Sequence, residues 1–199
     1  MANFTLLPIG RRKTEAVVRR IRFKEPILLL VMGAPGSGKS TVSKSLLETC
    51  NFVYLDNNFI ADSISRDSRV DDAYLELRRL VYDSLYRIAS ENLKVRNSVL
   101  LDVPHITHMT STTWRDEING IASATGATLK IVRCYCSERT LLQRIRSRGE
   151  PRDQWKLDNW PQFLEKEPMM VSIPLSHIDV NTERPINQNT AKIVEYLGA

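Results

Sequence analysis

The chain of 199 residues has no long hydrophobic run, few cysteines and no sign of a secretory leader. Its longest unbroken aliphatic stretch, Ile27–Met32, has the length of a strand and falls far short of the ~20 residues that cross a bilayer. The three cysteines follow no disulfide framework, which favours a reducing compartment. No charged region followed by an apolar one stands at the N-terminus. We therefore expect a globular protein of the cytoplasm with no membrane association.

Net charge is nearly absent from most of the chain and concentrated at its N-terminus. Residues 1–24 carry seven basic and one acidic side chain, whereas the whole chain has 28 basic and 23 acidic ones. The basic segment is either a solvated surface segment or an arm that binds a polyanion. The near-neutral remainder argues against a long nucleic-acid groove. We expect residues 1–25 to form a basic extension and residues 26–199 to form one domain.

Aliphatic runs and amphipathic segments alternate along residues 26–199, which predicts an α/β fold with a parallel sheet. The expected strands are Ile27–Met32, Phe52–Leu55, Ser98–Leu101, Thr128–Tyr135 and His177–Val180. The expected helices are Ser40–Thr49, Asp71–Lys94, Ser111–Thr125, Glu138–Ser147 and Asn187–Leu197. A polar stretch with proline and tryptophan, Gly149–Pro161, indicates a loop, followed by a short helix near Gln162–Lys166.

The first expected strand is followed by a glycine-rich loop that opens a helix. The sequence of this loop is Gly33, Ala34, Pro35, Gly36, Ser37, Gly38, Lys39 and Ser40. It matches G-x-x-x-x-G-K-S in the strand, loop and helix context that this motif requires. Glycines let backbone N–H groups turn toward phosphate oxygens, and the helix start adds its positive dipole. Together with Thr41, these residues predict a site for a nucleoside triphosphate, with a glycine turn that binds nothing as the alternative.

Lys39 and Ser40 have separate expected roles in this loop. The Lys39 ammonium group reaches the β- and γ-phosphates, and the Ser40 hydroxyl ligates Mg²⁺. Asp102 closes the strand at Ser98–Leu101, and Asp56 follows the strand at Phe52–Leu55. Because the carboxyl ends of adjacent parallel strands face one crevice, both aspartates should converge on the loop. Asp102 is the expected partner of Ser40 at Mg²⁺, with a helix cap as the alternative role.

Three arginines lie on the helix expected at Glu138–Ser147 and just beyond it. Arg144 and Arg148 stand four residues apart on one helix face, and Arg152 follows in the breaker-rich stretch. A planar guanidinium pairs with phosphate oxygens and stacks on a base. A solvated helix with salt bridges is the alternative. Beside a phosphate loop we interpret the three arginines as ligands of the nucleotide.

These motifs, in this order, resemble those of the P-loop kinases that phosphorylate small molecules, nucleosides or nucleic-acid ends. That group includes shikimate and gluconate kinases, chloramphenicol phosphotransferase, zeta toxins and polynucleotide kinase domains. The resemblance covers about residues 26–197. It implies a P-loop NTPase fold, with a five-stranded parallel sheet in the order 2-3-1-4-5 and helices on both faces.

The same resemblance assigns roles to particular residues. It implies that Asp56 accepts the proton of the substrate hydroxyl and that Arg144 stacks on adenine. It also implies that Arg148 and Arg152 touch phosphates from a lid around residues 144–160. Several relatives carry a second acid or an arginine close behind the substrate aspartate, whereas here the sequence continues with two asparagines. The resemblance therefore leaves the acceptor open.

Three functions fit this pattern. The leading one is an ATP-dependent, Mg²⁺-requiring kinase that phosphorylates a hydroxyl of a small molecule, with Lys39, Asp56, Arg148 and Arg152 as catalytic residues. The second is a 5′-hydroxyl polynucleotide kinase, in which the basic arm contacts the nucleic-acid backbone. The third is a nucleotide-binding switch or regulatory ATPase, against which the acceptor-type aspartate stands.

Other chemistry-bearing residues have simpler interpretations. His105 and His108 lie near Asp102, and Cys134 and Cys136 share one strand face. A metal site would need the two segments to meet, and buried cysteines commonly serve as small apolar side chains. His105 directly follows the third strand and is a candidate to line the substrate crevice.

Overall fold

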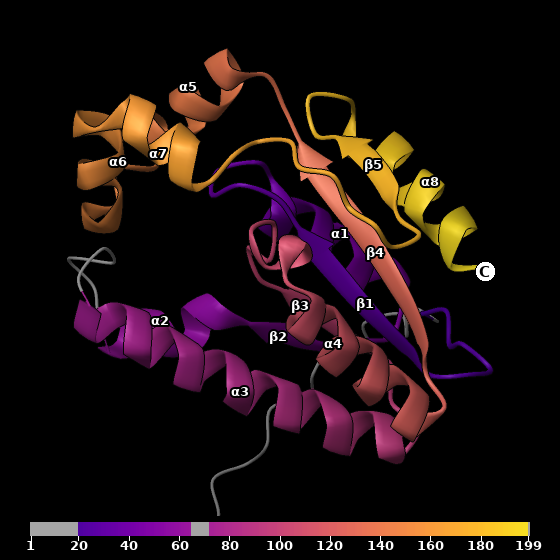
Figure 1. The fold of residues 1–199 in the computed structure, drawn as a ribbon. Helices are drawn as coiled ribbons and strands as arrows, with labels where there is room; N and C mark the ends of the chain where they lie inside the picture. The colour runs from indigo at the N-terminus through magenta and orange to yellow at the C-terminus, as the bar shows by residue number, and fades with distance from the viewer. Residues whose placement is uncertain (1–19, 65–71, 199) are drawn as a thin grey trace, which may run out of the picture.

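The computed structural model describes residues 20–64 and 72–198, and a parallel sheet of five strands forms its centre. The strands are β1 (Ile27–Met32), β2 (Val53–Asp56), β3 (Val99–Asp102), β4 (Thr128–Tyr135) and β5 (Ile178–Asn181). They lie in the order β2-β3-β1-β4-β5, and each neighbouring pair is parallel (Figure 1). The predicted order is confirmed, and each strand begins and ends within one residue of its predicted bounds.

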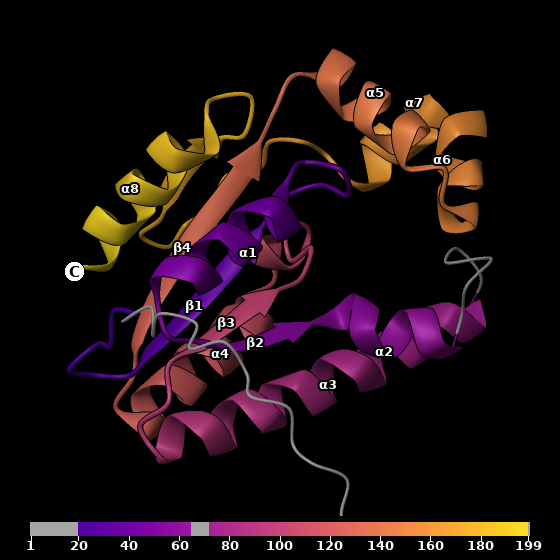
Figure 2. The same cartoon turned by 180° about the vertical axis from the view of Figure 1, so that it is seen from behind.

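Helices cover both faces of the sheet. The four that do so are α1 (Lys39–Thr49), α3 (Asp72–Lys94), α4 (Thr112–Thr125) and α8 (Ile186–Leu197). Alternate side chains of β1 point to opposite faces. Leu28, Leu30 and Met32 join a core cluster with α3 and α4, and Leu29 and Val31 join a second cluster with α1 and α8. Accordingly, α4 lies in front of the sheet in Figure 1 and α1 lies in front of it in Figure 2.

A group of short helices stands beyond the carboxyl end of the sheet (Figure 1). They are α5 (Glu138–Arg148), the 3₁₀ turn η2 (Pro151–Asp153), α6 (Gln154–Asp158) and α7 (Trp160–Lys166). We call residues 138–166 the α5–α7 segment. Its Leu141, Ile145 and Phe163 form a third apolar cluster with Ala34 and Cys136. This cluster attaches the segment to the loop after β1.

The prediction of a loop at Gly149–Pro161 is wrong, because most of this stretch is helical. Pro151 and Pro161 lie in the first turns of η2 and α7, where a missing backbone N–H leaves no hydrogen bond unmade. Trp155 and Trp160 pack against the third apolar cluster. In this sequence, Pro151 and Pro161 thus mark the starts of helices rather than an irregular loop.

Two further short elements were not predicted: α2 (Asn57–Ile64) and the 3₁₀ turn η1 (His108–Thr110). α2 follows β2 without a connecting loop. The Asp56 Oδ1 atom accepts a hydrogen bond from the Asn58 N–H at 2.8 Å, which satisfies a donor in the first turn of the helix. Among the helices of the described residues, none has the length and apolar character needed to cross a membrane.

The described chain before β1 lies against the end of α1. Ile21 forms a parallel bridge with Cys50, and the Phe23 and Phe52 rings lie 5.3 Å apart. The predicted extension at residues 1–25 thus includes residues that contact the domain, whereas its residues 1–19 lie outside the described part.

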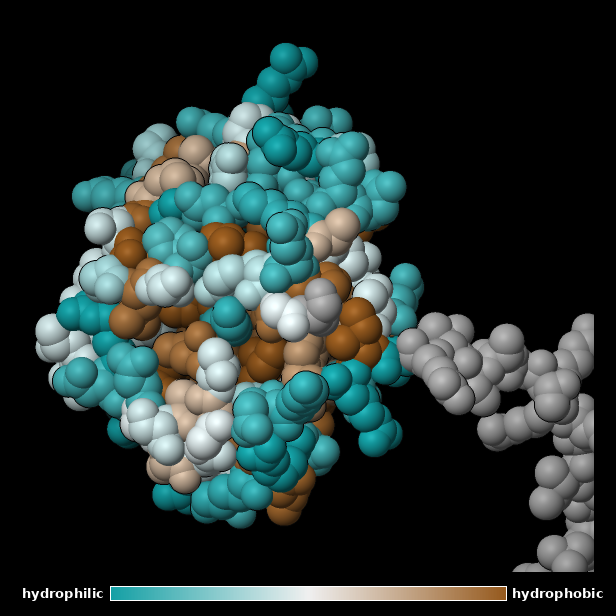
Figure 3. Space-filling model, turned by 90° about the vertical axis from the view of Figure 1, so that its right-hand side faces the viewer, coloured by the Kyte–Doolittle hydropathy of each residue, from teal (hydrophilic) through white to brown (hydrophobic). Residues whose placement is uncertain are grey.

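The face on the right of Figure 1 shows hydrophobic residues interrupted by hydrophilic ones (Figure 3).

Candidate functional site

The loop between β1 and α1 has a backbone conformation that favours glycine. Gly33, Gly36 and Gly38 have φ angles of 143°, 88° and 92°. A Cβ atom on Gly33 would lie 2.2 Å from the Cys134 carbonyl oxygen, so the loop runs too close to β4 for a side chain. α1 begins at Lys39, and no side chain caps its first turn. Its uncapped N–H groups and its dipole favour an anion in the loop.

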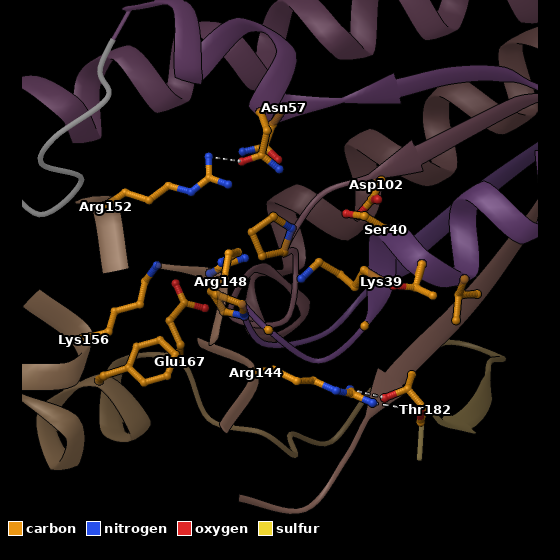
Figure 4. A pocket seen from close by; sticks show the side chains of 18 of the residues that line it. Lys39, Ser40, Asn57, Asp102, Arg144, Arg148, Arg152, Lys156, Glu167 and Thr182 are labelled. Atoms are coloured by element: carbon orange, nitrogen blue, oxygen red, sulfur yellow. Dashed lines mark hydrogen bonds between the residues drawn. The ribbon is translucent and has the colours of Figure 1, made fainter. Parts of the chain in front are cut away.

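The Lys39 ammonium group turns back onto this loop and lies at the centre of the site (Figure 4). Its Nζ donates to the carbonyl oxygens of Gly33 at 2.9 Å and Ala34 at 3.1 Å. Burial lowers the pKa of Lys39, and the nearby Asp102 carboxylate opposes that shift. A phosphate in the loop would supply a full negative charge to a cation that now has mainly carbonyl dipoles.

Two carboxylates lie side by side where β2 and β3 end. Asp56 and Asp102 are partners in the strand register, and both are buried. The Tyr54 hydroxyl oxygen lies 2.9 Å from Asp102 Oδ2 and 3.1 Å from Asp56 Oδ2. Because a hydroxyl has one proton to donate, Tyr54 donates to one carboxylate at a time. The structure thus brings the two aspartates together at the carboxyl end of the sheet, where the loop also lies.

Asp102 is the aspartate next to Ser40 (Figure 4). Burial raises the pKa of Asp102, while the Lys39 charge and a hydrogen bond with the Ser40 side chain lower it. A hydroxyl and a carboxylate are hard oxygen ligands of the kind that Mg²⁺ prefers. Within the described residues, no three His, Cys, Asp or Glu side chains gather to hold a metal. Ser40 and Asp102 are therefore the residues here whose oxygen atoms fit a magnesium ion.

Asp56 is held from two sides. Its Oδ1 atom accepts from the backbone N–H and the side-chain amide of Asn58, both at 2.8 Å, and its Oδ2 atom faces Tyr54. Asn57 and Asn58 line the cavity beside the loop, but Asp56 does not. To act on a bound hydroxyl, the Asp56 carboxylate would exchange one of these hydrogen bonds for the acceptor.

A cavity of about 790 Å³ lies beside the phosphate loop. It lies between the loop, α3, the α5–α7 segment and the chain that follows β5 (Figure 4). The predicted site residues that line it are Pro35, Gly36, Gly38, Lys39, Ser40, Thr41, Asp102, Arg144, Arg148 and Arg152. The predicted site residues outside its lining are Gly33, Ala34, Ser37 and Asp56.

All three predicted arginines have protein partners. Arg144 donates to the Thr182 hydroxyl at 2.8 Å and to the Thr182 carbonyl at 2.9 Å, just after β5. The Arg148 Nε atom donates to Asp153 at 2.7 Å. Arg152 forms an ion pair with Asp62 of α2, on the other side of the cavity. Arg144 and Arg152 are thus tied to other elements around the cavity, whereas Arg148 is exposed and pairs with an acid close by in the sequence.

Sequence reasoning missed the residues at the end of the cavity away from Thr182. Arg78 of α3 lies with its guanidinium 5.5 Å from the centre of the Tyr82 ring. Its Nη1 atom is 3.8 Å from Oε1 of Glu167, the residue after α7. Lys156, also in the lining, forms an ion pair with Asp153. Spacing in the sequence gave no sign of this group, because it marked Arg78 only as part of an amphipathic helix.

His105 does not line the crevice, so that prediction is wrong. Its side chain is fully buried, and its Nε2 atom lies 2.6 Å from the Tyr86 hydroxyl. The indole Nε1–H of Trp114 donates to the same hydroxyl at 2.8 Å. Burial lowers the pKa of His105 to about 3, so the ring stays neutral as a core side chain. Burial also raises the pKa of Cys134 to about 12, which leaves an unreactive thiol.

A family model described as AAA domain (AAA_33) matches residues 28–166. The matched region runs from β1 to the end of α7. It contains the phosphate loop, both aspartates and all three arginines.

Similarity to individual proteins is more distant. Adenylate kinase from Chlamydia trachomatis serovar D is 32% identical over 75 residues, which are 35% of this chain and 31% of that enzyme. The chain thus matches about a third of the length of that curated relative. A sugar kinase structure from a Janibacter species covers 87% of this chain and 95% of its own, with a TM-score of 0.63 and 15% identity.

A second solved structure is similar over nearly the whole fold. The APS kinase CysC of Mycobacterium tuberculosis, in complex with AMPPNP and APS, covers 88% of this chain and 99% of its own. The TM-score is 0.58 and the identity is 17%. At this level of identity the comparison shows the fold alone, which is that of the P-loop kinases.

Proposed function

Since the chain belongs to the AAA domain family (AAA_33) and has the P-loop kinase fold, we propose that it is an ATP-dependent phosphotransferase. The acceptor would be a hydroxyl group of a small molecule. The observation that carries this proposal is the placement of Lys39, Ser40 and Asp102 on the wall of a cavity that continues past them. A nucleotide bound in the loop would leave its γ-phosphate facing the rest of this space.

The nucleotide would occupy the end of the cavity near Thr182. Loop residues 33–41 would surround the phosphates with backbone N–H groups. Arg144, which donates to Thr182, would contact the base with its guanidinium face. Lys39 would leave the loop carbonyls for the β- and γ-phosphates, which offer it a stronger charge interaction.

Ser40 and Asp102 would hold Mg²⁺ together with the phosphates. The ion would supply charge neutralisation at the phosphate oxygens. Asp102 contributes a buried carboxylate for this purpose, and Tyr54 fixes the orientation of that carboxylate. ATP supply and the three free cysteines fit a cytoplasmic location.

Transfer would be an in-line displacement at the γ-phosphorus. A bond forms between the acceptor oxygen and phosphorus, and the bond to the β–γ bridging oxygen breaks with its electron pair going to ADP. The acceptor hydroxyl proton passes to Asp56. The products are ADP and a phosphomonoester. Asp56 supports this role because it is buried beside Asp102 and accepts two hydrogen bonds from Asn58 that fix its direction.

The α5–α7 segment would act as the lid. Arg148 and Arg152 line the cavity, and Arg152 reaches α2 on the far wall. A lid that closes over the nucleotide excludes water, which strengthens charge interactions and suppresses hydrolysis. Arg148 and Arg152 would stabilise charge on the moving phosphoryl group by partly exchanging their carboxylate partners for phosphate oxygens.

A transfer assay tests the proposal. The full chain is incubated with Mg²⁺ and γ-labelled ATP in the presence of sugars, polyols, hydroxy acids, nucleosides and a 5′-hydroxyl oligonucleotide, and labelled products are separated. We expect label in one small hydroxy compound and dependence on Lys39. Label in the oligonucleotide alone would favour the polynucleotide kinase. Release of phosphate with no labelled acceptor would favour a regulatory ATPase.

A further inference from the structure

An ion pair that is too long to be a hydrogen bond lies at the acceptor end of the cavity. Arg78 Nη1 and Glu167 Oε1 are 3.8 Å apart, beyond hydrogen-bond distance, and the two side chains are 23% and 17% exposed. Glu167 Oε2 is buried and has no hydrogen-bond partner within the described residues. The described part likewise contains no hydrogen bond donated by the Arg78 guanidinium. Both groups therefore retain hydrogen-bonding capacity that a ligand can use.

Three other cations of the cavity have close carboxylate partners, unlike Arg78. Arg152 is paired with Asp62, and Asp153 accepts from both Arg148 and Lys156. Each of these cations thus contacts a carboxylate at close range. Arg78 instead has the face of an aromatic ring, which positions its guanidinium without using its N–H groups.

The pair also lies within electrostatic range of the phosphate loop. Glu167 raises the pKa of Lys39, and Lys39 in turn opposes the rise that burial causes in the pKa of Glu167. In Figure 4 the Glu167 carboxylate points from the end of α7 into the space between Lys156 and Arg148. A small molecule that touches Arg78 and Glu167 can therefore also present a group toward the loop.

We propose, resting on the kinase function above, that Arg78 and Glu167 bind an acceptor with a carboxylate and, on the neighbouring carbon, an amino or hydroxyl group. The planar fork of Arg78 takes the two carboxylate oxygens. Glu167 accepts the hydrogen of the neighbouring donor. The hydroxyl that is phosphorylated lies further along the same molecule, toward Asp56. Binding would supply a hydrogen bond to the buried Glu167 Oε2 atom and to the half-buried Arg78 guanidinium, which is a source of specificity.

Matched acceptors separate the two contacts. L-serine, L-homoserine and D-glycerate carry a carboxylate with a neighbouring donor. L-serinamide and L-homoserinamide lack the carboxylate charge, and 3-hydroxypropanoate and 4-hydroxybutanoate lack the neighbouring donor. With the full chain, Mg²⁺ and γ-labelled ATP, we expect at least one complete acid to exceed its matched analogues in kcat/KM by about 10-fold or more.

Variants then assign each contact to its residue. Arg78→Gln should lower kcat/KM for the preferred acid about 10- to 100-fold and leave its amide unchanged. Glu167→Gln should lower kcat/KM for the complete acid but not for the analogue that lacks the neighbouring donor. Arg79→Gln, on the exposed face of the same helix, is the matched control and should change neither value. Arg78→Lys keeps the charge without the fork and should recover only part of the loss.

A simpler role, in which the pair only holds α7 against α3, gives a different pattern. Arg78→Gln and Glu167→Gln would then lower activity on every acceptor equally and reduce thermal stability. That result, or equal use of the acids and their amides, overturns the proposal and leaves the kinase function standing. Failure of the kinase function alone is detected by calorimetry of acid binding in the presence of AMPPNP. An acid that binds in an Arg78-dependent way without transfer keeps the acid site and rejects the kinase, and no binding of any acid rejects the site.

Discussion

The two walls of the cavity are built in different ways. On the loop wall, Lys39 is held by carbonyls only five and six residues away in sequence. On the wall formed by the α5–α7 segment, Arg144 and Arg152 are held by residues 38 and 90 positions away. The first wall depends on the local conformation of one short loop. The second depends on the assembly of α2, α5 and the chain after β5. Local motifs therefore specify the phosphate side, and tertiary packing specifies the rest.

The largest expected effect comes from Lys39→Ala, which removes the cation that we propose contacts the phosphates. Backbone N–H groups alone leave the γ-phosphate charge poorly neutralised, so turnover should fall by about 10³-fold. Steady-state turnover and calorimetry with Mg²⁺-ATP measure the loss. Circular dichroism should show a retained fold, because Lys39 is held only by loop carbonyls. Unchanged turnover and affinity would refute the role of the loop.

The next largest effect is expected from Asp56→Asn, a change beside Asp102 at the end of β2. We expect transfer to fall by about 10²-fold, because general base assistance is lost, with ATP affinity close to that of the unchanged protein. Single-turnover transfer and ATP binding are measured side by side. The asparagine keeps the size of the side chain and can still accept from Asn58. An equal loss of ATP affinity would place Asp56 at the metal and assign the base role elsewhere.

Lysine replacements in the α5–α7 segment should have smaller effects that differ between positions. Arg148→Lys and Arg152→Lys should lower turnover about 10-fold with little change in ATP affinity, since their proposed role is to stabilise charge on the moving phosphoryl group. Arg144→Lys should instead weaken nucleotide binding, because a lysine cannot reproduce the planar contact with the base or both bonds to Thr182. Turnover and ATP affinity are compared for the three variants, with Arg146→Lys on the exposed face of α5 as control. If all three variants behave like the control, these arginines have only a structural role.

Deletion of residues 1–19 should have the smallest effect. This cut keeps the Ile21 bridge to Cys50 and the Phe23 contact with Phe52. Phosphorylation of a small acceptor should be unchanged within about twofold, since the shortened chain keeps every cavity residue named above. Under the polynucleotide hypothesis, the same deletion weakens oligonucleotide binding and flattens its salt dependence. A salt titration of binding by the full and shortened chains separates the two hypotheses.

The sequence predicted the features that follow from local chemistry. Aliphatic strands ended in Asp56 and Asp102, and the glycine pattern located the turn into α1, because backbone geometry restricts which residues fit there. It did not predict α2, whose first residues, Asn57 and Asn58, favour turns as readily as helices. It also missed the Arg78–Glu167 pair, since two charges 89 positions apart meet only after α3 and α7 have packed.

Asp153 has a consequence for hybrids made between this protein and its relatives. The buried Asp153 carboxylate accepts from both Arg148 and Lys156, so the three residues must be inherited together. A crossover between them removes one of the two cations that neutralise the buried Asp153 carboxylate and so destabilises the hybrid. Junctions placed before Glu138 and after Lys166 exchange the set whole. Grafting this stretch as one cassette thus keeps the Asp153 contacts together, and Thr182 and Asp62 must be kept in the recipient as partners of Arg144 and Arg152.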